Sequence, residues 1–187
     1  MTSLRTLVCH VRESNSIECI YEGKNCGQFE RHLEAAKAVR ARGKIADLMT
    51  PLEITSILLP FKWQYRSSGV RVGGRIMPAP ERVPLLMEHW IISWRKYHHF
   101  LSHRPESFWG PWAASRAWFF HDWFLCIHPF EDGNGRTARL LLNSFRLRAG
   151  LPWLVVHESR KSEYYTKIRE FEGSNFRTWY PARPTSL

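Results

Sequence analysis

The sequence predicts a mostly α-helical domain around one buried helix, with a small β-hairpin flap. Apolar residues recur at helical spacing through most of the chain. The segment 111–127 is apolar almost all round, which is typical of a helix at the centre of a domain. Only residues 61–80 alternate and carry a Gly-Gly pair, which indicates a hairpin. At 187 residues the chain, 1–187, corresponds to a single domain.

The first half of the chain contains two predicted core helices before the flap. Residues 28–42 are charged and alanine-rich and predict a helix, with Gly43 as its C-cap. The run 50–53 (Thr-Pro-Leu-Glu) combines a capping box with a proline at the first helical position. That helix should end near Leu59, because Pro60 disfavours its continuation.

The flap is predicted over residues 69–76, where valines alternate with an arginine and two glycines can make the turn. The residues that would form the strand and turn are Val70, Arg71, Val72, Gly73 and Gly74.

The spacing of apolar residues in the second half of the chain predicts four more helices, over 83–101, 111–127, 135–148 and 162–171. The tail that follows, 176–187, contains no acidic residue, and we expect it to be poorly ordered. The expected inward-facing residues of the first and third of these helices are Leu85, Leu86, Trp90, Ile91, Trp94, Leu140, Leu141, Leu142 and Phe145.

Composition narrows the function classes. Twenty-seven basic residues against 17 acidic ones give a net charge of +10, which favours anionic partners, namely nucleotides, nucleic acid, acidic protein surfaces or an anionic membrane, without choosing among them. The four cysteines are irregularly spaced, as expected of reduced thiols rather than of disulfide or zinc frameworks. Neither a signal peptide nor a run of about 20 apolar residues is evident. We therefore expect a cytoplasmic protein with no membrane partner.

The residues from 128 to 139, His-Pro-Phe-Glu-Asp-Gly-Asn-Gly-Arg-Thr-Ala-Arg, have the chemistry of an anion site. The Gly-Asn-Gly loop can turn successive N–H groups toward one point, and it opens directly into a helix whose N-terminus carries partial positive charge. Arg136 and Arg139 share one face of that helix, so their guanidinium groups could hold consecutive phosphates.

Two further residues suggest transfer chemistry rather than binding alone. A carboxylate at Asp132 beside phosphates makes sense if Mg²⁺ takes both kinds of oxygen. His128 follows the buried helix, and a neutral imidazole there can accept a proton from an attacking hydroxyl. Base, metal, anion cradle and arginine clamp together indicate transfer of a nucleotide phosphate.

This stretch resembles the signature of the Fic family, H-P-F-x-[D/E]-G-N-G-R-x-x-R, at every specified position, and the resemblance extends over roughly residues 10–175. It implies a Fic-type fold and transfer of AMP from ATP, with Mg²⁺, to a Ser, Thr or Tyr hydroxyl of a target protein or of the enzyme itself. By this resemblance His128 is the base and Asp132 holds Mg²⁺. The backbone of Gly133, Asn134 and Gly135 stabilises the charge that develops on the transferred phosphate. Arg136 holds the β-phosphate, and Arg139 holds the γ-phosphate.

A second resemblance lies near the N-terminus. Some Fic proteins carry the pattern S/T-x-x-x-E-[G/N] on an inhibitory helix. Ser14 and Glu18 match this pattern and lie four residues apart, on one face of the expected helix. Cys19 departs from it, because the pattern has Gly or Asn at that position. In that class the glutamate pairs with the second arginine of the signature, here Arg139. The resemblance implies an inhibitory region over about 10–27 before a core over about 28–175, and a target-docking role for the flap.

Several alternatives stay open at this point. A Fic-type enzyme could use another nucleotide-like donor, or remove AMP by the same site; Doc-type kinases carry Lys where this chain has Gly135, which makes phosphorylation the weaker hypothesis. Outside the class, the net charge alone suggests a nucleic-acid-binding protein, although no such motif is present and no specific nucleic acid is expected. Homo-oligomer formation is also left open.

Overall fold

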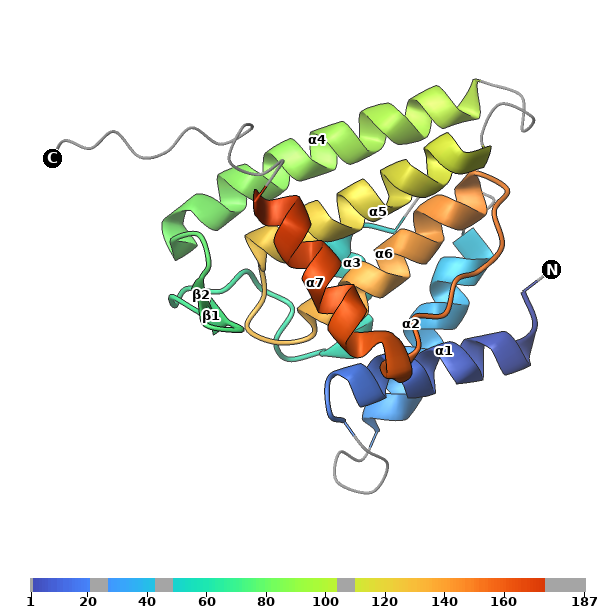
Figure 1. Cartoon of the computed structure of the whole chain (residues 1–187), viewed down its shortest axis with the longest axis horizontal. Coiled ribbons are helices and arrows are strands. Elements are labelled where there is room, and N and C mark those ends of the chain that lie inside the picture. The colour runs from blue at the N-terminus through green and yellow to red at the C-terminus, as the bar shows by residue number, and fades with distance from the viewer. Residues whose placement is uncertain (1, 21–26, 43–48, 104–109, 174–187) are drawn as a thin grey trace, which may run out of the picture.

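Seven α-helices and one short hairpin make up the described part of the chain, residues 2–20, 27–42, 49–103 and 110–173 of the computed structural model (Figure 1). The predicted cap Gly43 and tail 176–187 lie outside these residues. The elements are α1 (Leu4–Ile17), α2 (Gln28–Arg42), α3 (Pro51–Leu58), β1 (Arg71–Val72), β2 (Arg75–Ile76), the short 3-10 turn η1 (Pro80–Arg82), α4 (Val83–Ser102), α5 (Gly110–Ile127), α6 (Asn134–Arg148), the 3-10 turn η3 (Glu158–Arg160) and α7 (Lys161–Phe171).

The helix at the centre is α6, which packs against α1, α2, α3, α4 and α5. Every residue from Arg136 to Phe145 is buried. The expectation that 111–127 forms the centre is therefore wrong in this detail: α5 lies along one side of α6, and its outer residues Trp112, Phe119 and Trp123 are only partly buried. Apolarity alone singled out α5, because α6 buries several polar side chains that lower its hydropathy.

Between α4, α5 and α6 lies an aromatic core. Trp90 and Trp94 stack at 5.0 Å between ring centroids, and Phe120 and Phe145 contact Trp94 at 5.3 Å each. The Trp90 indole donates a hydrogen bond to the Phe120 carbonyl (3.0 Å), so this deeply buried N–H has a partner. The expected inward residues are confirmed except at two positions: Leu85 is 50% exposed and Ile91 is only partly buried.

The start of α3 follows the predicted capping box. The Glu53 amide donates to the Thr50 hydroxyl (3.2 Å), and the Thr50 amide donates to the Glu53 carboxylate (2.6 Å). Pro51 occupies the first helical position, where its missing N–H has no cost. This helix ends at Leu58, and Leu59 then reaches the loop before α6.

The flap forms as an antiparallel pair in which Arg71 faces Ile76 and Val72 faces Arg75. Gly73 and Gly74 adopt φ values of 54° and 82°, the left-handed conformations that a two-residue turn of this kind needs. In Figure 1 the hairpin projects at one end of the helices, beside the loop that joins α5 to α6.

Two further features position the site. α7 crosses in front of α5 and α6 and buries Tyr164 and Ile168 (Figure 1). α1 is held to α2 by a buried hydrogen bond of 2.8 Å between the Asn15 amide oxygen and the His32 ring. None of the helices in the described ranges combines the length and apolarity needed to cross a membrane.

Candidate active site

The predicted base, His128, lies directly after α5. Its amide donates to the Phe124 carbonyl (3.0 Å), and its φ of 51° turns the chain sharply out of the helix. Phe130, fully buried against Tyr65 and Phe124, anchors the turn that follows. The segment 128–130, called the neck below, is therefore rigid, because a backbone hydrogen bond fixes one end of it and aromatic packing fixes the other. This neck carries the imidazole.

Arg66 holds this neck and the flap together, a role that the sequence did not indicate beyond its position ahead of the flap. Its guanidinium donates to the His128 carbonyl (2.8 Å), to the Ser68 carbonyl (2.9 Å) and to the Pro78 carbonyl (2.5 Å). Its backbone N–H donates to the Pro129 carbonyl (2.9 Å). One buried side chain therefore ties the base to both ends of the hairpin.

The loop before α6 leaves the start of that helix open to an anion. Gly133 is the N-cap at φ 75° and provides no side chain to cap the helix. The buried Asn134 side chain instead closes the loop from within: its oxygen accepts from the Phe130 amide (3.0 Å) and its nitrogen donates to the Phe130 carbonyl (2.7 Å). The first N–H groups of α6 therefore face outward with the positive end of the helix dipole.

Arg136 is fully buried one turn into α6, and its head group reaches back to the rim of the site. It donates to the Gln28 side-chain oxygen (2.8 Å) and to both carboxylate oxygens of Asp132 (3.3 Å each). The Asp132 side chain remains 53% exposed, and it also accepts from the Gly133 amide (2.6 Å). Burial lowers the pKa of Arg136, while Asp132 acts in the opposite direction.

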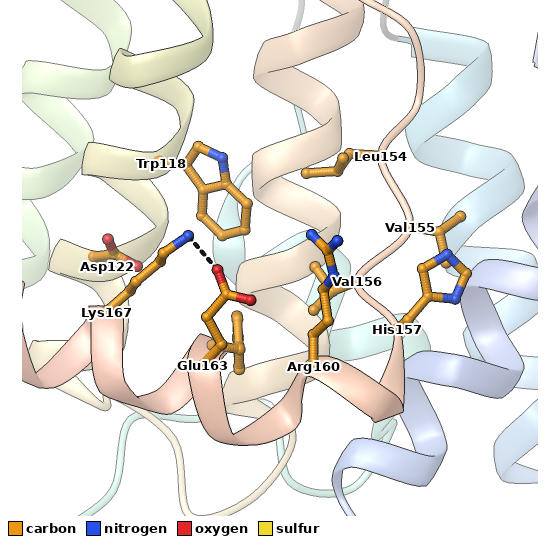
Figure 2. A pocket seen from close by; sticks show the side chains of 10 residues that line it. Trp118, Asp122, Leu154, Val155, Val156, His157, Arg160, Glu163 and Lys167 are labelled. Atoms are coloured by element: carbon orange, nitrogen blue, oxygen red, sulfur yellow. Dashed lines mark ion pairs between the residues drawn. The ribbon is translucent and has the colours of Figure 1, made fainter.

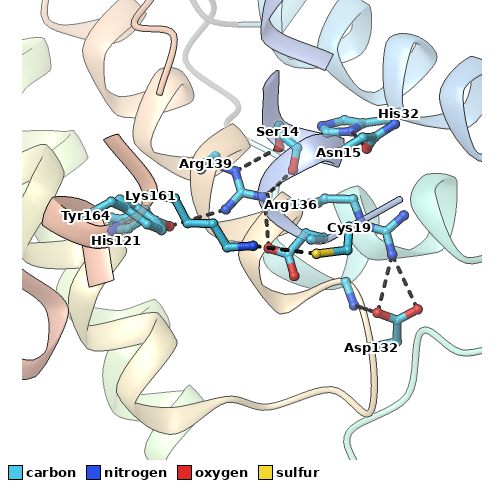
Figure 3. Close-up of polar contacts among 12 residues, drawn as sticks. Ser14, Asn15, Cys19, His32, His121, Asp132, Arg136, Arg139, Lys161 and Tyr164 are labelled. Carbon is cyan, nitrogen blue, oxygen red and sulfur yellow. Dashed lines mark hydrogen bonds and ion pairs between the residues drawn. The ribbon is translucent and has the colours of Figure 1, made fainter. Parts of the chain in front are cut away.

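Arg139, the second arginine, is engaged by the N-terminal helix (Figure 3). Its Nε donates to the Ser14 hydroxyl (2.7 Å), and its Nη2 donates to the Ser14 carbonyl (2.9 Å) and to Glu18 Oε1 (2.9 Å). Its Nη1 donates to the Tyr164 hydroxyl (3.3 Å). The structure thus brings the two residues of the N-terminal pattern to the arginine that the resemblance named.

Glu18 lies beside the start of α6 as well as beside Arg139. A Cβ atom built on Gly135 would collide with the Glu18 carboxylate, so only a glycine there lets the carboxylate lie this close. The charge of Glu18 acts on both arginines of the signature. A carboxylate in this position is stabilised by the helix dipole and by two cations.

One detail of the inhibitory-region prediction needs correction. The helix runs from Leu4 to Ile17, so it begins before residue 10, and Glu18 is its C-cap rather than a residue inside it. Ser14 and Glu18 still reach the same arginine, because the first turn beyond the helix keeps the side chain on that side. Residues 21–26 lie outside the described part.

The turn after α1 places a left-handed residue at position 19. The Ile20 amide donates to the Asn15 carbonyl (2.9 Å) and the Cys19 amide to the Ser16 carbonyl (3.0 Å), which together form a Schellman motif. Cys19 is its left-handed residue, with φ 57°. Glycine or asparagine adopts this conformation readily, whereas another residue pays about 1 kcal/mol or more. The departure at Cys19 thus concerns backbone conformation, and its exposed side chain accepts a long hydrogen bond from Lys161 Nζ (3.5 Å).

We expect Cys19→Gly to stabilise the protein by about 1 kcal/mol, or roughly 2–4 °C in Tm for a domain of this size. The gain comes from removing left-handed strain. Thermal unfolding followed by circular dichroism measures it. Cys9→Gly is the matched control, because Cys9 is exposed within the same helix, where glycine should cost about 1 kcal/mol. A lower Tm for Cys19→Gly would contradict the assignment.

Of the residues predicted for the flap, Arg71 and Val72 form its first strand and Gly73 and Gly74 its turn, whereas Val70 precedes the strand. Arg71 is exposed, and Val70 and Val72 are half-buried. The Met77 amide donates to the Val70 carbonyl (3.1 Å), which extends the hairpin by one further bond. On the opposite side, Arg75 forms an ion pair with Glu172 just beyond α7.

The protonation state of His128 follows from its surroundings. Burial, together with the nearby Arg66 guanidinium, lowers its pKa to about 4, although Glu18 acts in the opposite direction. The imidazole is consequently neutral near pH 7 and has a free nitrogen lone pair. The charge of Glu18 acts on His128 as well as on Arg136 and Arg139, so the imidazole and both guanidinium groups lie around one carboxylate. A neutral base and two buried cations around one anion have the chemistry of a site that handles a phosphate-like group.

Comparison with known proteins assigns the chain to a family. The model of the Fic/DOC family matches residues 45–146, more than half of the chain. The chain therefore belongs to the Fic/DOC family. Its family segment contains the neck, the loop and both arginines described above.

Relatives extend the comparison in sequence. A protein adenylyltransferase Fic of Drosophila virilis is 38% identical over 105 residues, and one of Aedes aegypti is 36% identical over 106 residues. These matches cover 54% and 57% of this chain and 19% of each relative, so the chain spans about a fifth of the length of these curated relatives.

Solved structures share the fold. A Fic domain containing signaling protein from Bacteroides thetaiotaomicron has a TM-score of 0.72 at 21% identity, covering 91% of this chain and 73% of that one. Fic-1 from C. elegans has a TM-score of 0.67 at 20% identity, covering 93% and 58%. The helical architecture with its hairpin is therefore a Fic-like fold.

Proposed function

We propose that this domain transfers AMP from ATP to a hydroxyl side chain of a target protein and of itself, and that Glu18 restrains the reaction. The observation that carries the proposal is the carboxylate of Glu18 beside Gly135 and Arg139. The protein's own anion lies where the signature would hold phosphate. The names of its relatives, protein adenylyltransferases, support the same chemistry.

In the proposed reaction the hydroxyl oxygen of the target attacks the α-phosphorus of ATP. A new oxygen–phosphorus bond forms, the bond to the bridging oxygen of the β-phosphate breaks, and pyrophosphate leaves. The neutral imidazole of His128 accepts the hydroxyl proton. The N–H groups at the start of α6 stabilise the charge that develops on the α-phosphoryl oxygens, because they are fixed in place before the reaction begins.

The two arginines divide the remaining phosphates. Arg136, already close to the rim through Asp132, holds the β-phosphate and eases its departure. Arg139 holds the γ-phosphate once Glu18 gives way, since the two anions compete for one guanidinium. Restraint by Glu18 thus follows from competition rather than from blockage of the whole cleft.

Mg²⁺ suits the donor set of this site. Asp132 offers an exposed carboxylate at the mouth, and Mg²⁺ commonly takes one or two carboxylates and completes its shell with substrate phosphates and water. No cluster of three histidine, cysteine or acidic side chains occurs in the described ranges, so phosphate oxygens would supply the other ligands. When bound, the cation neutralises phosphate charge.

The flap would hold the target. An extended segment adding along Val70–Val72 would gain backbone hydrogen bonds and bring its hydroxyl toward His128. Arg66 supports this arrangement because it links the hairpin ends to the His128 carbonyl. Arg66 would thereby position both the hairpin that binds the target segment and the backbone of the base.

Labelled ATP tests the proposed reaction. Purified Glu18→Gly protein, with Mg²⁺ and lysate, should acquire label from ATP labelled at the α-phosphate and none from ATP labelled at the γ-phosphate. Label from the γ-position would show phosphoryl transfer instead. Absence of label from both would refute transfer from ATP.

The pH dependence follows from the lowered pKa of His128, about 4. The base is neutral above that value, so activity is lost only as pH falls through it. At pH 5.5 the transfer rate should stay within about 10% of its value at pH 7.5, whereas a histidine of ordinary pKa would leave roughly a tenth. Initial rates of Glu18→Gly labelling measure this.

Folding must be followed in the same samples. The buried His10, with its pKa lowered to about 3, makes the unfolded state bind more protons, so stability falls as pH drops below about 6.5. Circular dichroism at each pH separates this loss from protonation of His128. A midpoint near pH 6.5 in protein that remains folded would contradict the assignment.

A further inference from the structure

A cavity of about 550 Å³ lies between α5, the extended segment before η3, and α7 (Figure 2). It is separate from the candidate active site, since none of the residues from 128 to 139 lines it. Tyr164 forms part of its wall, and the hydroxyl of that residue reaches Arg139. The cavity has the size of small-molecule sites.

One side of the cavity is apolar, formed by Trp118, Leu154 and Val156. Figure 2 shows the side chain of Arg160 rising from the start of α7 toward Leu154 and Val156. A flat apolar body can pack against the indole while a cation binds an attached acid.

The charges around the cavity leave Arg160 as the group available to a ligand. The Asp122 carboxylate accepts from His121 (2.7 Å), and Glu163 pairs with Lys167 (2.7 Å). Within the described ranges, the Arg160 guanidinium forms neither a hydrogen bond nor an ion pair, and its charge acts on the Glu163 carboxylate without direct pairing. A planar guanidinium beside an apolar wall selects a carboxylate, sulfonate or phosphate on an organic body.

We propose that this cavity binds a small organic anion with a flat apolar body, and that its occupancy is coupled to the pair between Glu18 and Arg139. The coupling runs through hydrogen bonds of consistent polarity. Arg139 donates to the Tyr164 oxygen (3.3 Å), the Tyr164 hydroxyl donates to His121 Nε2 (2.9 Å), and His121 Nδ1 donates to Asp122 (2.7 Å).

Tyr164 is the element that both sites share. Tyr164 lines the cavity, so a ligand packed against this residue restricts its side chain and keeps the hydroxyl directed at Arg139. Arg139 is then held in the position from which it binds Glu18. Because coupling is reciprocal, breaking the Glu18 pair must weaken binding in the cavity. Control of AMP transfer by this ligand would rest on the proposed function. The coupling between the cavity and the pair of Glu18 and Arg139 does not depend on it.

Binding is tested with anilinonaphthalene sulfonate, a fluorescent aromatic sulfonate. Arg160→Gln should weaken its binding about tenfold, the expected loss of one charge-assisted contact, and Val156→Trp should abolish it by filling the cavity. Arg5→Gln is the matched control: it removes the same charge at a different surface hollow, on α1, and should bind as wild type. Wild-type affinity in folded Arg160→Gln would overturn the site.

The coupling is tested in the same titration, without ATP. Glu18→Gly should weaken probe binding by roughly threefold to fivefold although Glu18 does not line the cavity. In a Tyr164→Phe background, which keeps the wall and removes the hydroxyl, the effect of Glu18→Gly should vanish. Glu34→Gln, an exposed acid on α2, is the control and should change nothing. An unchanged affinity in Glu18→Gly would overturn the coupling. Failure of label transfer from ATP would leave these binding results unaffected.

Discussion

His128→Ala should lower the rate of AMP transfer by at least a hundredfold and up to about ten-thousandfold, the range for loss of a positioned general base. Affinity for ATP should remain within about twofold of its original value, because the expected phosphate contacts come from the start of α6 and from Arg136 and Arg139 rather than from the imidazole. The comparison is made in the Glu18→Gly background. Label incorporation measures transfer, and isothermal titration with ATP measures binding.

A matched histidine separates chemistry from folding in this experiment. His89 is exposed on α4, outside the segment from His128 to Arg139, and His89→Ala should retain full transfer. The Tm of His128→Ala should stay close to that of its parent, since Arg66 contacts the backbone carbonyl of residue 128 and not its side chain. Undiminished transfer by His128→Ala would remove the imidazole from the mechanism.

Glu18→Gly should raise self-labelling by about tenfold to a hundredfold. Removing the carboxylate frees one arm of Arg139, and a hydrogen bond to a charged group is worth about 1.5–3 kcal/mol. Only 1% of the Arg139 side chain is exposed, so solvent screens this contact weakly. Initial rates with α-labelled ATP measure the effect.

Two further variants define the cause of this increase. Glu18→Gln keeps an oxygen that accepts from Arg139 but loses the charge, so its activity should lie between wild type and Glu18→Gly. Adding His128→Ala to Glu18→Gly should return labelling to background, because both residues would act on one reaction. Equal labelling by wild type and Glu18→Gly would show that the carboxylate does not restrain transfer.

Short sequence motifs predicted helix ends and turns well where the motif's own residues determine the backbone conformation. The capping box at Thr50 starts α3, and the glycine pair turns the flap, because each rests on contacts within four residues. The loop before α6 also belongs to this group: its glycine must adopt a left-handed conformation wherever the helix lies. The spacing of residues from His128 to Arg139 therefore indicated a phosphate-binding loop without knowledge of the fold.

Contacts between distant segments could not be predicted in this way. Arg66 precedes His128 by 62 positions, and its role depends on where two loops meet. Tyr164 reaches Arg139 only because α7 crosses α5 and α6. The sequence did not reveal the central place of α6 for a similar reason, since its buried Arg136 and Arg139 donate hydrogen bonds to Gln28 and Ser14, which are far away in the chain.

The sequence by itself determined the family, the helical elements with their hairpin, and the set of groups available for phosphate chemistry, because spacing along one chain sets which side chains share a turn. Only the tertiary structure decided that Glu18 ends its helix beside Gly135, that Arg139 is shared between Ser14, Glu18 and Tyr164, and that a second cavity lies behind that tyrosine. These features depend on how separate helices pack, and packing joins residues more than a hundred positions apart.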